Sequence, residues 1–519
     1  MRAPRTLRFA RRLAAAALLT IPLPLQAQAP DARFDPVRDT IRALMAAQNI
    51  PSVSVAIARG DRILWEESFG WADKERQVRA SPRTMYSLAS ISKPITATGL
   101  MVLAERGLVR LDEPANRYLD GAKLRAFEGA AEEATIRRLL THTAGLPLHY
   151  QFFYSGRTPV HSMDTAIARY GVVVYPPGER YFYSNLGYGI LDHIIARVSG
   201  SSYADFMRRE VFEPLGLAEM VVSDGSDLGE RAAVRYETDG SPLPPYTFDH
   251  LGASSVYASA HDLVRFGQWH LGARIRGARD VLPAATRARM QRSDAPAEAP
   301  GSSRGWGWGI VEDDNGLRRV AHGGGMPGVA TVLMLYPAES LAVVVLANTS
   351  GAPTARIAAA MTSAVAPEYA RVRQARADSI RQARAASGAT AAGGPAAPVL
   401  PEAMNALETV AGVWRGALLV RGDSVPLVLT LASDGRGTAR LADGPAAELN
   451  NLRLTDGWVT AGFRAEVPGP EAAGPNGSGP HNIVVHLRIR GDGLRGWASV
   501  IARSALSYGA VSYRAELAR

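Results

Sequence analysis

One segment without regular apolar spacing divides this 519-residue chain into parts with different patterns. Residues 386–401 consist mainly of Ala, Gly and Pro, a composition typical of linkers. Helix-like and strand-like segments are mixed before the linker, whereas short alternating strands with turn signals fill the sequence after it. The sequence therefore predicts a mixed helix-and-strand unit followed by an all-β unit.

The mixed unit is expected over residues 34–365. Helical periodicity at 34–49 precedes two strand-like runs, 52–58 and 63–69, and a densely apolar, buried helix is expected at 90–106. A polar and helical section then extends to about residue 290. Strands resume at 306–311, 318–322, 329–336 and 341–348. Early and late strands around a helical insert predict one antiparallel sheet assembled from both ends of the unit.

The all-β unit is expected to be a small closed barrel, because eight short strands follow one another from 412 to 517. These strands are expected at 412–420, 425–432, 437–442, 451–454, 458–465, 483–490, 493–501 and 510–517, with a Pro/Gly-rich loop at 468–480. Residues 368–385, rich in Arg and Ala, are expected to be helical. The predicted fold class is α/β of the α+β type, an antiparallel sheet flanked by helices with a helical subdomain, plus this barrel.

The first 29 residues are typical of a bacterial secretory signal. Five arginines precede an apolar run at 13–25, and small residues at 27 and 29 offer a cleavage site. The run is short and contains two prolines, so a membrane span is not expected. These features predict a periplasmic or secreted protein without a stable membrane span after cleavage. The predicted division is 1–29 signal, 30–367 mixed domain, 368–403 helix and linker, and 404–519 barrel.

Composition excludes several classes of function. The chain has no cysteine, which rules out disulfides, thiolate catalysis and thiolate metal sites. No His-Glu-x-x-His motif is present, so we expect no metal and no cofactor. The formal net charge of +9 includes the five arginines of the leader. A nucleic-acid-binding protein would be expected to have a basic face with interleaved aromatic residues, and the sequence does not show such a pattern.

Lysine is rare, and one of the three lysines lies in the sequence Ser90-Ile-Ser-Lys93. An arginine stays protonated in proteins, whereas a buried lysine can lose its proton. At the start of a helix, a spacing of three residues puts the hydroxyl and the amine on one face. That arrangement suits a serine nucleophile with a lysine partner.

Two further motifs follow in order, Tyr183-Ser-Asn185 and His322-Gly323-Gly324. With Ser90-x-x-Lys93, this order resembles the serine β-lactamase and penicillin-recognising DD-peptidase superfamily, in its class C branch. The resemblance covers roughly residues 34–365 and includes the stretches 88–94, 135–147 and 177–188.

The resemblance implies a role for each residue. Ser90 would become acylated, Lys93 would take or relay its proton, and Tyr183 would share that duty, its phenolate favoured by Lys93. Asn185 would hydrogen-bond Lys93 and the substrate amide. The backbone N–H groups of Ser90 and Gly325 would form an oxyanion hole, and glycine at 323–325 would let the substrate approach the strand.

His322 departs from class C β-lactamases, which usually carry Lys at that position to hold a substrate carboxylate. A neutral imidazole there resembles DD-peptidases, D-aminopeptidases and related esterases more closely. The sequence therefore predicts an exported serine hydrolase acting on small amides, D-amino-acid peptides or esters, including peptidoglycan-derived ones. A true β-lactamase, an acylated β-lactam or peptidoglycan sensor and a binding protein without turnover are the alternatives.

Structural interpretations of the same residues also exist. Ser90 is a suitable helix N-cap and Lys93 a suitable solvated residue; Tyr183-Ser-Asn185 suits a packed turn, and His322 the end of a strand. His142 is interpreted as a buried, hydrogen-bonded histidine, and Trp306-Gly-Trp-Gly309 as strand packing.

In the second unit, Gly412-Val-Trp414 resembles the start of lipocalin-like barrels. The barrel is expected to be either a stabilising module or one with a loop that reaches the cleft.

Overall fold

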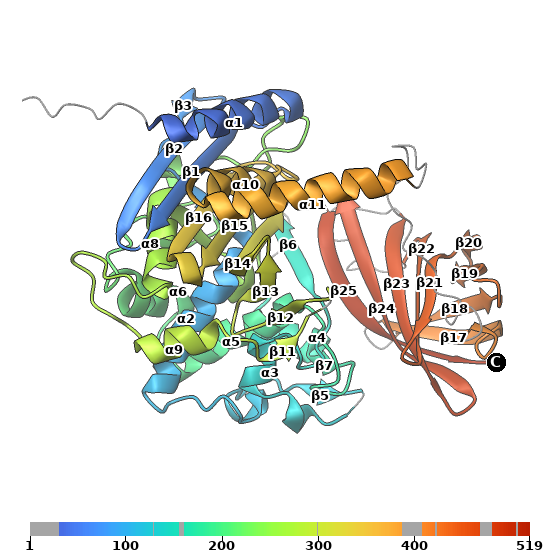
Figure 1. The fold of residues 1–519 in the computed structure, drawn as a ribbon. Coiled ribbons are helices and arrows are strands. Elements are labelled where there is room, and N and C mark those ends of the chain that lie inside the picture. The colour runs from blue at the N-terminus through green and yellow to red at the C-terminus, as the bar shows by residue number, and fades with distance from the viewer. Residues whose placement is uncertain are drawn as a thin grey trace, which may run out of the picture.

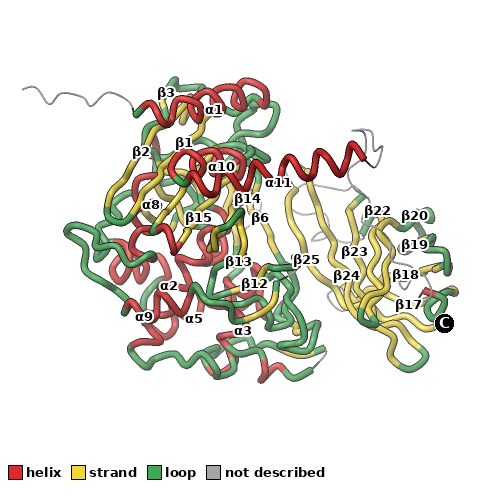
Figure 2. The backbone as a smooth tube through the Cα atoms, in the orientation of Figure 1, coloured by secondary structure: helices red, strands yellow, loops and turns green. Residues whose placement is uncertain are grey.

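The computed structural model describes residues 31–127, 129–154, 160–297, 299–386, 407–420, 423–467, 480–504 and 507–519. A mixed unit and a β-barrel lie side by side, and helix α11 (Pro367–Ala386) extends from the first toward the second (Figure 1). Helices gather in the mixed unit, whereas strands dominate the barrel (Figure 2). The predicted signal segment 1–29 and nearly all of the predicted linker and of the 468–480 loop lie outside the described residues.

The mixed unit is organised around a nine-stranded sheet in the order β11-β12-β13-β14-β15-β16-β1-β2-β3. Its strands are β1 (Ser52–Arg59), β2 (Arg62–Asp73), β3 (Val78–Arg79), β11 (Ala295–Pro296), β12 (Ser302–Arg304), β13 (Gly309–Asp314), β14 (Leu317–Met326), β15 (Val329–Tyr336) and β16 (Leu341–Ala347). The early strand β1 pairs antiparallel with the late strand β16, with Val53 opposite Ala347. The predicted sheet built from both ends of the unit is therefore confirmed.

The central strands are buried on both faces, which explains their continuous apolar runs. In β16, Val343 and Val345 enter one core, whereas Val344 and Leu346 enter the other. Helices α1 and α10 pack over the first core, and α8 packs against β1 and β16 from the opposite side. A polar side chain on β16 would lack a solvated face, and none of the seven residues of this strand is polar.

The helices of the mixed unit are α1 (Asp35–Gln48), α2 (Ser92–Glu105), α3 (Ile136–Leu140), α4 (Met163–Tyr170), α5 (Asn185–Ser199), α6 (Tyr203–Met207), α7 (Leu251–Ser254), α8 (Ala260–His270), α9 (Ala284–Met290) and α10 (Thr354–Val365). Shorter strands lie among them: β4 (Met85–Ser87), β5 (Arg125–Ala126), β6 (Tyr150–Tyr154), β7 (Val172–Val173), β8 (Met220–Val222), β9 (Tyr246–Phe248) and β10 (Val256–Ser259).

Helix α2 is the central helix, and every residue from Ser92 to Leu103 is buried. The predicted burial of this helix is therefore confirmed, but its start differs. Ser90 lies in a separate 3-10 turn, Ala89–Ile91, that leads directly into α2. Ala89 has a φ of 48°, a left-handed conformation that costs free energy in a residue with a side chain.

Three predicted strands of the main sheet have different boundaries in the structure. The strand expected at 63–69 extends to Asp73 in β2. Strand β14 continues through His322 and the three glycines to Met326, because these residues stay paired with β15. The segment 306–308 is a turn, and β13 starts only at Gly309. The turn has this shape because Gly307, with a φ of 82°, packs against the start of α2, where a Cβ would lie 2.7 Å from the Pro94 Cα.

The second unit is a nearly closed barrel in the strand order β20-β19-β18-β17-β25-β24-β23-β22-β21. Its strands are β17 (Gly412–Val420), β18 (Asp423–Leu431), β19 (Gly437–Leu441), β20 (Ala447–Glu448), β21 (Asn450–Thr455), β22 (Trp458–Ala465), β23 (His481–Arg490), β24 (Gly493–Ser504) and β25 (Ser507–Ala518). All eight predicted strands are present, and the two-residue strand β20 was not predicted. Strand β25 also pairs with β6 of the mixed unit, with Ala510 opposite Tyr150.

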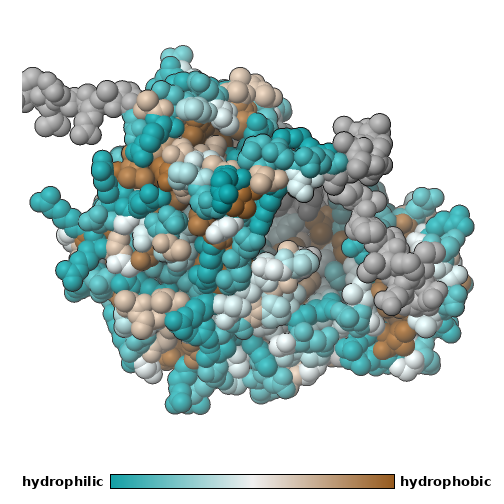
Figure 3. Space-filling view, in the orientation of Figure 1, coloured by the Kyte–Doolittle hydropathy of each residue, from teal (hydrophilic) through white to brown (hydrophobic). Residues whose placement is uncertain are grey.

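The face of the molecule seen in Figure 3 is largely hydrophilic, and it is hollowed below α11 between the mixed unit and the barrel. Within the part of the chain that the structure describes, no helix combines the length and apolar character needed to cross a bilayer.

The glycines of β14 differ in how closely they approach the turn that carries Ser90. A Cβ on Gly324 would lie 2.1 Å from the Leu88 carbonyl oxygen and 2.2 Å from Thr331 Oγ1. That same hydroxyl donates to the Leu88 carbonyl at 2.9 Å and joins β15 to the turn. A Cβ on Gly325 would meet no atom within 4 Å. Gly324 therefore permits the contact between sheet and turn.

We expect Gly324→Ala to lower the free energy of unfolding by about 1–3 kcal/mol, because the added methyl group overlaps backbone and side-chain atoms. Gly325→Ala is the matched control, for which a change within about 1 kcal/mol is expected. Urea unfolding of the two variants measures the difference. Equal stability of the two variants would contradict the close packing of Gly324.

Candidate active site

Three residues from separate elements meet around the Lys93 amine. Its Nζ lies 3.1 Å from Ser90 Oγ in the 3-10 turn and 2.8 Å from Asn185 Oδ1 at the start of α5. The carbonyl oxygen of Ala253 in α7 lies 3.1 Å away. Ser90 is partly exposed, whereas Lys93 is fully buried. The structure thus brings Ser90, Lys93 and Asn185 together as the sequence predicts.

The electrostatic surroundings of Lys93 favour a neutral amine. Burial first, and the charge of Arg304 second, lower the pKa of Lys93 well below the usual value of a lysine. The amine contacts amide, carbonyl and hydroxyl oxygens, and no carboxylate of a described residue forms an ion pair with it. A neutral lysine can accept a proton from a hydroxyl 3.1 Å away.

Tyr183 lies above the same amine, with the centroid of its ring 4.7 Å from Lys93 Nζ. Burial raises the pKa of Tyr183, and a hydrogen bond with Ser90 opposes this effect only in part. The expected phenolate is therefore not favoured in this site: the structure gives Tyr183 a neutral phenol, because solvation of a phenolate is lost on burial. A neutral phenol can donate a proton.

The segment before α5 is fixed by the loop around His142. The Ser184 N–H donates to His142 Nδ1 at 3.1 Å, and the Ser184 hydroxyl donates to the Pro147 carbonyl at 2.6 Å. Ser184 Oγ also accepts the Gly187 N–H at 3.1 Å, which caps α5. Tyr183 and Asn185 therefore flank a residue held at three points. His142 is buried and hydrogen-bonded, as its structural interpretation predicts.

His322 borders the site on β14, and its ring centroid lies 6.5 Å from that of Tyr183. Its Nδ1 donates to the Gly323 carbonyl oxygen at 2.7 Å, if the proton is assigned to that nitrogen. Burial, followed by the charge of Lys93 in its protonated form and the charge of Arg304, lowers the pKa of His322 to about 3. The imidazole is neutral at ordinary pH. Gly323 and Gly325 are exposed beside it along the edge of the site.

Arg304 is a residue of the site that the sequence analysis missed. Its charge lowers the pKa of Lys93, His322 and His142, which shows that it lies near all three. Its Nη2 donates to the Tyr181 hydroxyl at 2.7 Å, and its Nε is buried without a hydrogen-bond partner among the described residues. No carboxylate of a described residue forms an ion pair with it. A guanidinium in this condition is suited to an anionic group supplied from outside.

No signal in the sequence distinguished Arg304 from the other arginines. The chain has 58 basic residues, of which only three are lysines, so one more arginine carries no information by itself. Its position at the end of β12 becomes meaningful only after β12 pairs with β13, where Arg304 lies opposite Gly309.

The barrel contacts the segment that leads to Tyr183. Tyr175 lies between Trp458 and Trp497 of the barrel, with centroid distances of 4.4 and 4.3 Å. Phe182, next to Tyr183, lies 5.7 Å from Trp497. Arg180 adds an ion pair to Asp456 at 3.4 Å. The contact therefore combines packed rings with an ion pair.

One cluster of described residues has the types and spacing of metal ligands. His149, Asp249 and His250 are buried, and their ligand atoms lie within 4.8 Å of one another. The Asp249 carboxylate lies 3.1 Å from His149 Nε2 and 2.7 Å from His250 Nδ1. These hydrogen bonds satisfy the carboxylate through the two imidazoles.

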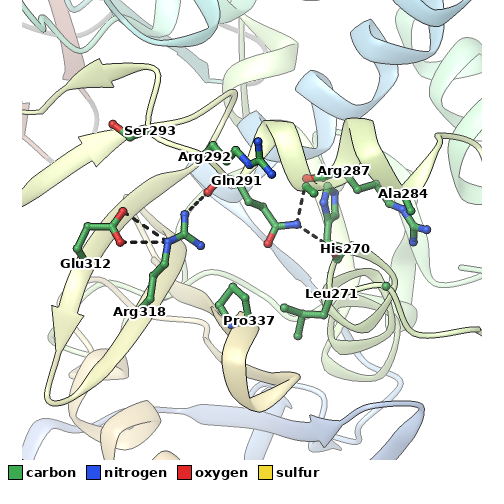
Figure 4. A pocket seen from close by; sticks show the side chains of 12 residues that line it. His270, Leu271, Ala284, Arg287, Gln291, Arg292, Ser293, Glu312, Arg318 and Pro337 are labelled. Atoms are coloured by element: carbon green, nitrogen blue, oxygen red, sulfur yellow. Dashed lines mark hydrogen bonds and ion pairs between the residues drawn. The ribbon is translucent and has the colours of Figure 1, made fainter.

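A cavity of about 600 Å³ lies beside α8 and α9, and its lining does not include a nucleophile beside a buried amine as at Ser90 and Lys93 (Figure 4). The polar groups that line it bond to one another: Gln291 Nε2 donates to the carbonyl oxygen of His270, and Arg318 pairs with Glu312 at 3.2 Å. The reactive arrangement among the described residues is therefore the one around Lys93.

Comparison with known proteins agrees with this geometry. The model of the Beta-lactamase family matches residues 37–366. Penicillin-binding protein 4* of Bacillus subtilis (strain 168) is 28% identical over 324 residues, which cover 57% of this chain and 67% of that protein. Protein flp of Staphylococcus aureus (strain MRSA252) is 24% identical over 306 residues, 58% of this chain and 60% of flp. The match thus spans about three fifths of flp.

Solved structures share the fold. The octameric penicillin-binding protein homologue from Pyrococcus abyssi has a TM-score of 0.54 at 22% identity and covers 93% of this chain and 99% of its own. A class C beta lactamase from Rhodobacter sphaeroides has a TM-score of 0.52 at 24% identity, covering 63% of this chain and 98% of its own. EstCE1, described as a hydrolase with promiscuous acyltransferase activity, has a TM-score of 0.53 at 21% identity, with coverage of 63% and 97%.

The family model covers more than half of the chain, and the three sequence motifs meet at one site inside the matched region. The chain belongs to the beta-lactamase family, the fold family of serine β-lactamases and penicillin-binding proteins.

Proposed function

We propose that this protein is a serine hydrolase that forms an acyl-enzyme on Ser90. The observation that supports this most directly is the buried Lys93 amine at 3.1 Å from Ser90 Oγ, with a lowered pKa. A solvated lysine beside a helix cap would be exposed and protonated, so the structural interpretation of the motif does not account for its burial.

In the first half of the reaction, Lys93 accepts the proton of Ser90 while Oγ attacks the substrate carbonyl carbon. The resulting oxyanion is stabilised by the backbone N–H groups of Ser90 and Gly325. Tyr183, a neutral phenol in the free site, donates its proton to the leaving nitrogen or oxygen and regains a proton from Lys93. Collapse of the oxyanion breaks the bond to the leaving group and leaves the acyl group on Ser90.

In the second half, water takes the place of the leaving group. The Lys93 amine takes one proton from the water as the water attacks the ester carbonyl. Tyr183 donates its proton to Ser90 Oγ as that oxygen leaves, and then recovers a proton from Lys93. Asn185 holds the Lys93 amine in position at 2.8 Å throughout. The cycle consumes one water and needs no cofactor.

The substrates that fit the site best carry a carboxylate. His322 is neutral and cannot supply the fixed charge of the usual lysine, but Arg304 provides a permanent cation near the same residues. Small D-amino-acid peptides with a free carboxyl terminus, such as peptidoglycan-derived ones, carry such a carboxylate. Neutral amides and esters lack it and would bind less tightly.

A true β-lactamase is the second candidate, since β-lactams also carry a carboxylate that Arg304 would attract. The sensor and the binding protein without turnover are less well supported, because the neutral Tyr183 supplies a proton donor for both halves of the reaction. We further propose export to the periplasm or the medium and a division into domains near residues 367 and 404, with peptide substrates as partners and no nucleic acid.

The decisive experiment follows acylation and turnover in the same samples. The protein is mixed with a fluorescent penicillin, a chromogenic ester and a D-Ala-D-Ala peptide, and adduct mass and product are recorded. We expect turnover of the peptide or the ester, with slow or no hydrolysis of the penicillin. Ser90→Ala should lower the rate by about 10⁴-fold or more, because the nucleophile is removed.

Ser92→Ala is the matched control, since Ser92 lies two residues after Ser90, is buried, and accepts a hydrogen bond from the Val256 N–H at 3.0 Å. It should reduce stability and leave the acyl adduct on Ser90. Activity that survives in Ser90→Ala would contradict the nucleophile, and a stable adduct without turnover would support the sensor.

Lys93→Arg should be nearly inactive although it keeps a basic side chain, because a guanidinium does not give up its proton. Single-turnover acylation by the ester measures this directly. A rate within about tenfold of the wild type would contradict Lys93 as the proton acceptor.

The pH dependence separates Lys93 from His322. Because Lys93 must be neutral, kcat/KM should rise with pH through the lowered pKa of Lys93 and level off above it. His322 has a pKa of about 3 and is already neutral over this range. His322→Gln should therefore show the same rise of kcat/KM with pH, even if the absolute rate falls. Loss of that rise would mean that His322, and not Lys93, is the titrating group.

Arg304→Gln tests the carboxylate preference. For a peptide with a free carboxyl terminus, we expect KM to rise roughly 10–100-fold, the loss expected for one charge-assisted hydrogen bond. The C-terminal amide of the same peptide should be affected far less. An equal effect on both substrates would mean that Arg304 acts through the protein and not through the carboxylate.

A further inference from the structure

A cavity of about 620 Å³ lies where the mixed unit meets the barrel, apart from Ser90 and Lys93. Its mixed-unit wall contains Arg125, Pro147 and Tyr170, and its barrel wall contains Trp497 and Arg514. The volume falls within the range typical of sites for small organic ligands.

The barrel contributes its outer surface to this cavity. Along β25, Val511, Tyr513 and Ala515 enter the hydrophobic core, so the alternating residues Ser512 and Arg514 point outward. Trp497 on β24 likewise belongs to a separate cluster with Tyr175, outside the main core. The cavity is therefore an interface site and not the interior of the barrel.

The cavity is positively charged and partly apolar. Arg125, Arg169 and Arg514 line it, and no Asp or Glu is among its described lining residues. The Arg125 Nη2 donates to the Ala168 carbonyl at 2.8 Å, and no carboxylate of a described residue pairs with this guanidinium. Arg514 stacks 4.4 Å above the Phe127 ring and pairs with Glu516, which is not a lining residue.

The residues that line the cavity also include a buried hydrogen-bond donor. Trp497 is 1% exposed, and its indole N–H has no hydrogen-bond partner among the described residues. A buried donor without an acceptor destabilises the protein, and an acceptor supplied by a ligand would remove that cost. Aromatic and aliphatic side chains, including Tyr170, Val172 and Val174, form the remaining wall.

We propose that this cavity binds an organic anion with a carboxylate head and an aliphatic body, that is, a medium-chain carboxylate. The guanidiniums of Arg125 and Arg514 bind the head, and the aromatic and aliphatic wall covers the chain. This class of ligand uses both the excess of positive charge and the apolar surface, whereas an inorganic anion would use only the charge.

Occupancy is coupled to the candidate active site through two contacts. Pro147 lines the cavity, and its carbonyl accepts the Ser184 hydroxyl between Tyr183 and Asn185. Trp497 lines it as well and lies 5.7 Å from Phe182, the residue before Tyr183. A ligand that orders these walls therefore orders the segment that holds Tyr183. This coupling rests on the proposed function, whereas the binding itself does not.

Calorimetric titration of the full protein with dodecanoate, below its micellar concentration, tests the site. We expect one saturable site per chain and at least tenfold weaker binding in both Arg125→Gln and Arg514→Gln. Ala168→Phe, which places a ring at the exposed cavity wall, should abolish binding. Dodecanol, which has the same chain without the charge, should bind at least tenfold more weakly than dodecanoate.

Arg440→Gln is the matched control, because Arg440 is an exposed arginine on β19, separated from β25 by β18 and β17. Its affinity should equal that of the wild type, and the thermal transitions of all variants identify any that fail to fold. Three results would overturn the site. These are absence of saturable binding, wild-type affinity for dodecanoate in the Arg125 and Arg514 variants, and an affinity for dodecanol equal to that for dodecanoate.

The coupling has a separate readout. Saturating dodecanoate should change kcat of the chromogenic ester at least twofold in the wild type and leave it unchanged in Ala168→Phe. Binding of dodecanoate by a protein that turns over neither the ester nor the D-Ala-D-Ala peptide would reject the proposed function and keep the site. Turnover that is identical with and without bound dodecanoate would reject the coupling.

Discussion

The arrangement of the mixed unit depends on placing one amine in a dry environment without an opposing charge. Lys93 is held by oxygens from three elements that are far apart in the sequence: the turn at Ser90, the start of α5 and helix α7. Burying a protonated amine in such a place costs more free energy than these hydrogen bonds return, so the neutral form is preferred. The surrounding packing maintains this condition by excluding water from the amine.

The neighbouring elements show what that condition requires. Gly324 and Gly307 approach the turn and the start of α2 at distances that exclude any side chain. Thr331 ties the sheet to Leu88, and the loop at His142 ties the segment of Tyr183 and Asn185 to α3 and its following residues. Sheet, central helix and helical insert therefore converge on one point. The sheet between its two cores supplies the rigid side of this arrangement.

Much of this organisation could be predicted from the sequence, because apolar spacing is a local signal and the three motifs are short. The sheet built from both ends, the buried α2 and the barrel strands follow from such patterns. The neutral state of Tyr183 and the role of Arg304 could not be predicted, since burial and proximity arise only after distant strands pair. The same holds for the turn at Ser90: residue spacing does not encode the left-handed φ of Ala89, with which this turn begins.

The pairing of β25 with β6 has a consequence for the order in which the molecule is assembled. During synthesis, β6 emerges long before β25, because the two strands are far apart in the sequence. One edge of β6 therefore has unpaired backbone groups while the mixed unit folds. An unpaired strand edge promotes association between chains. The same late strand also pairs with β17, so the barrel and the junction with the mixed unit are completed together. The nascent chain therefore remains vulnerable to association with other chains until β25 has emerged.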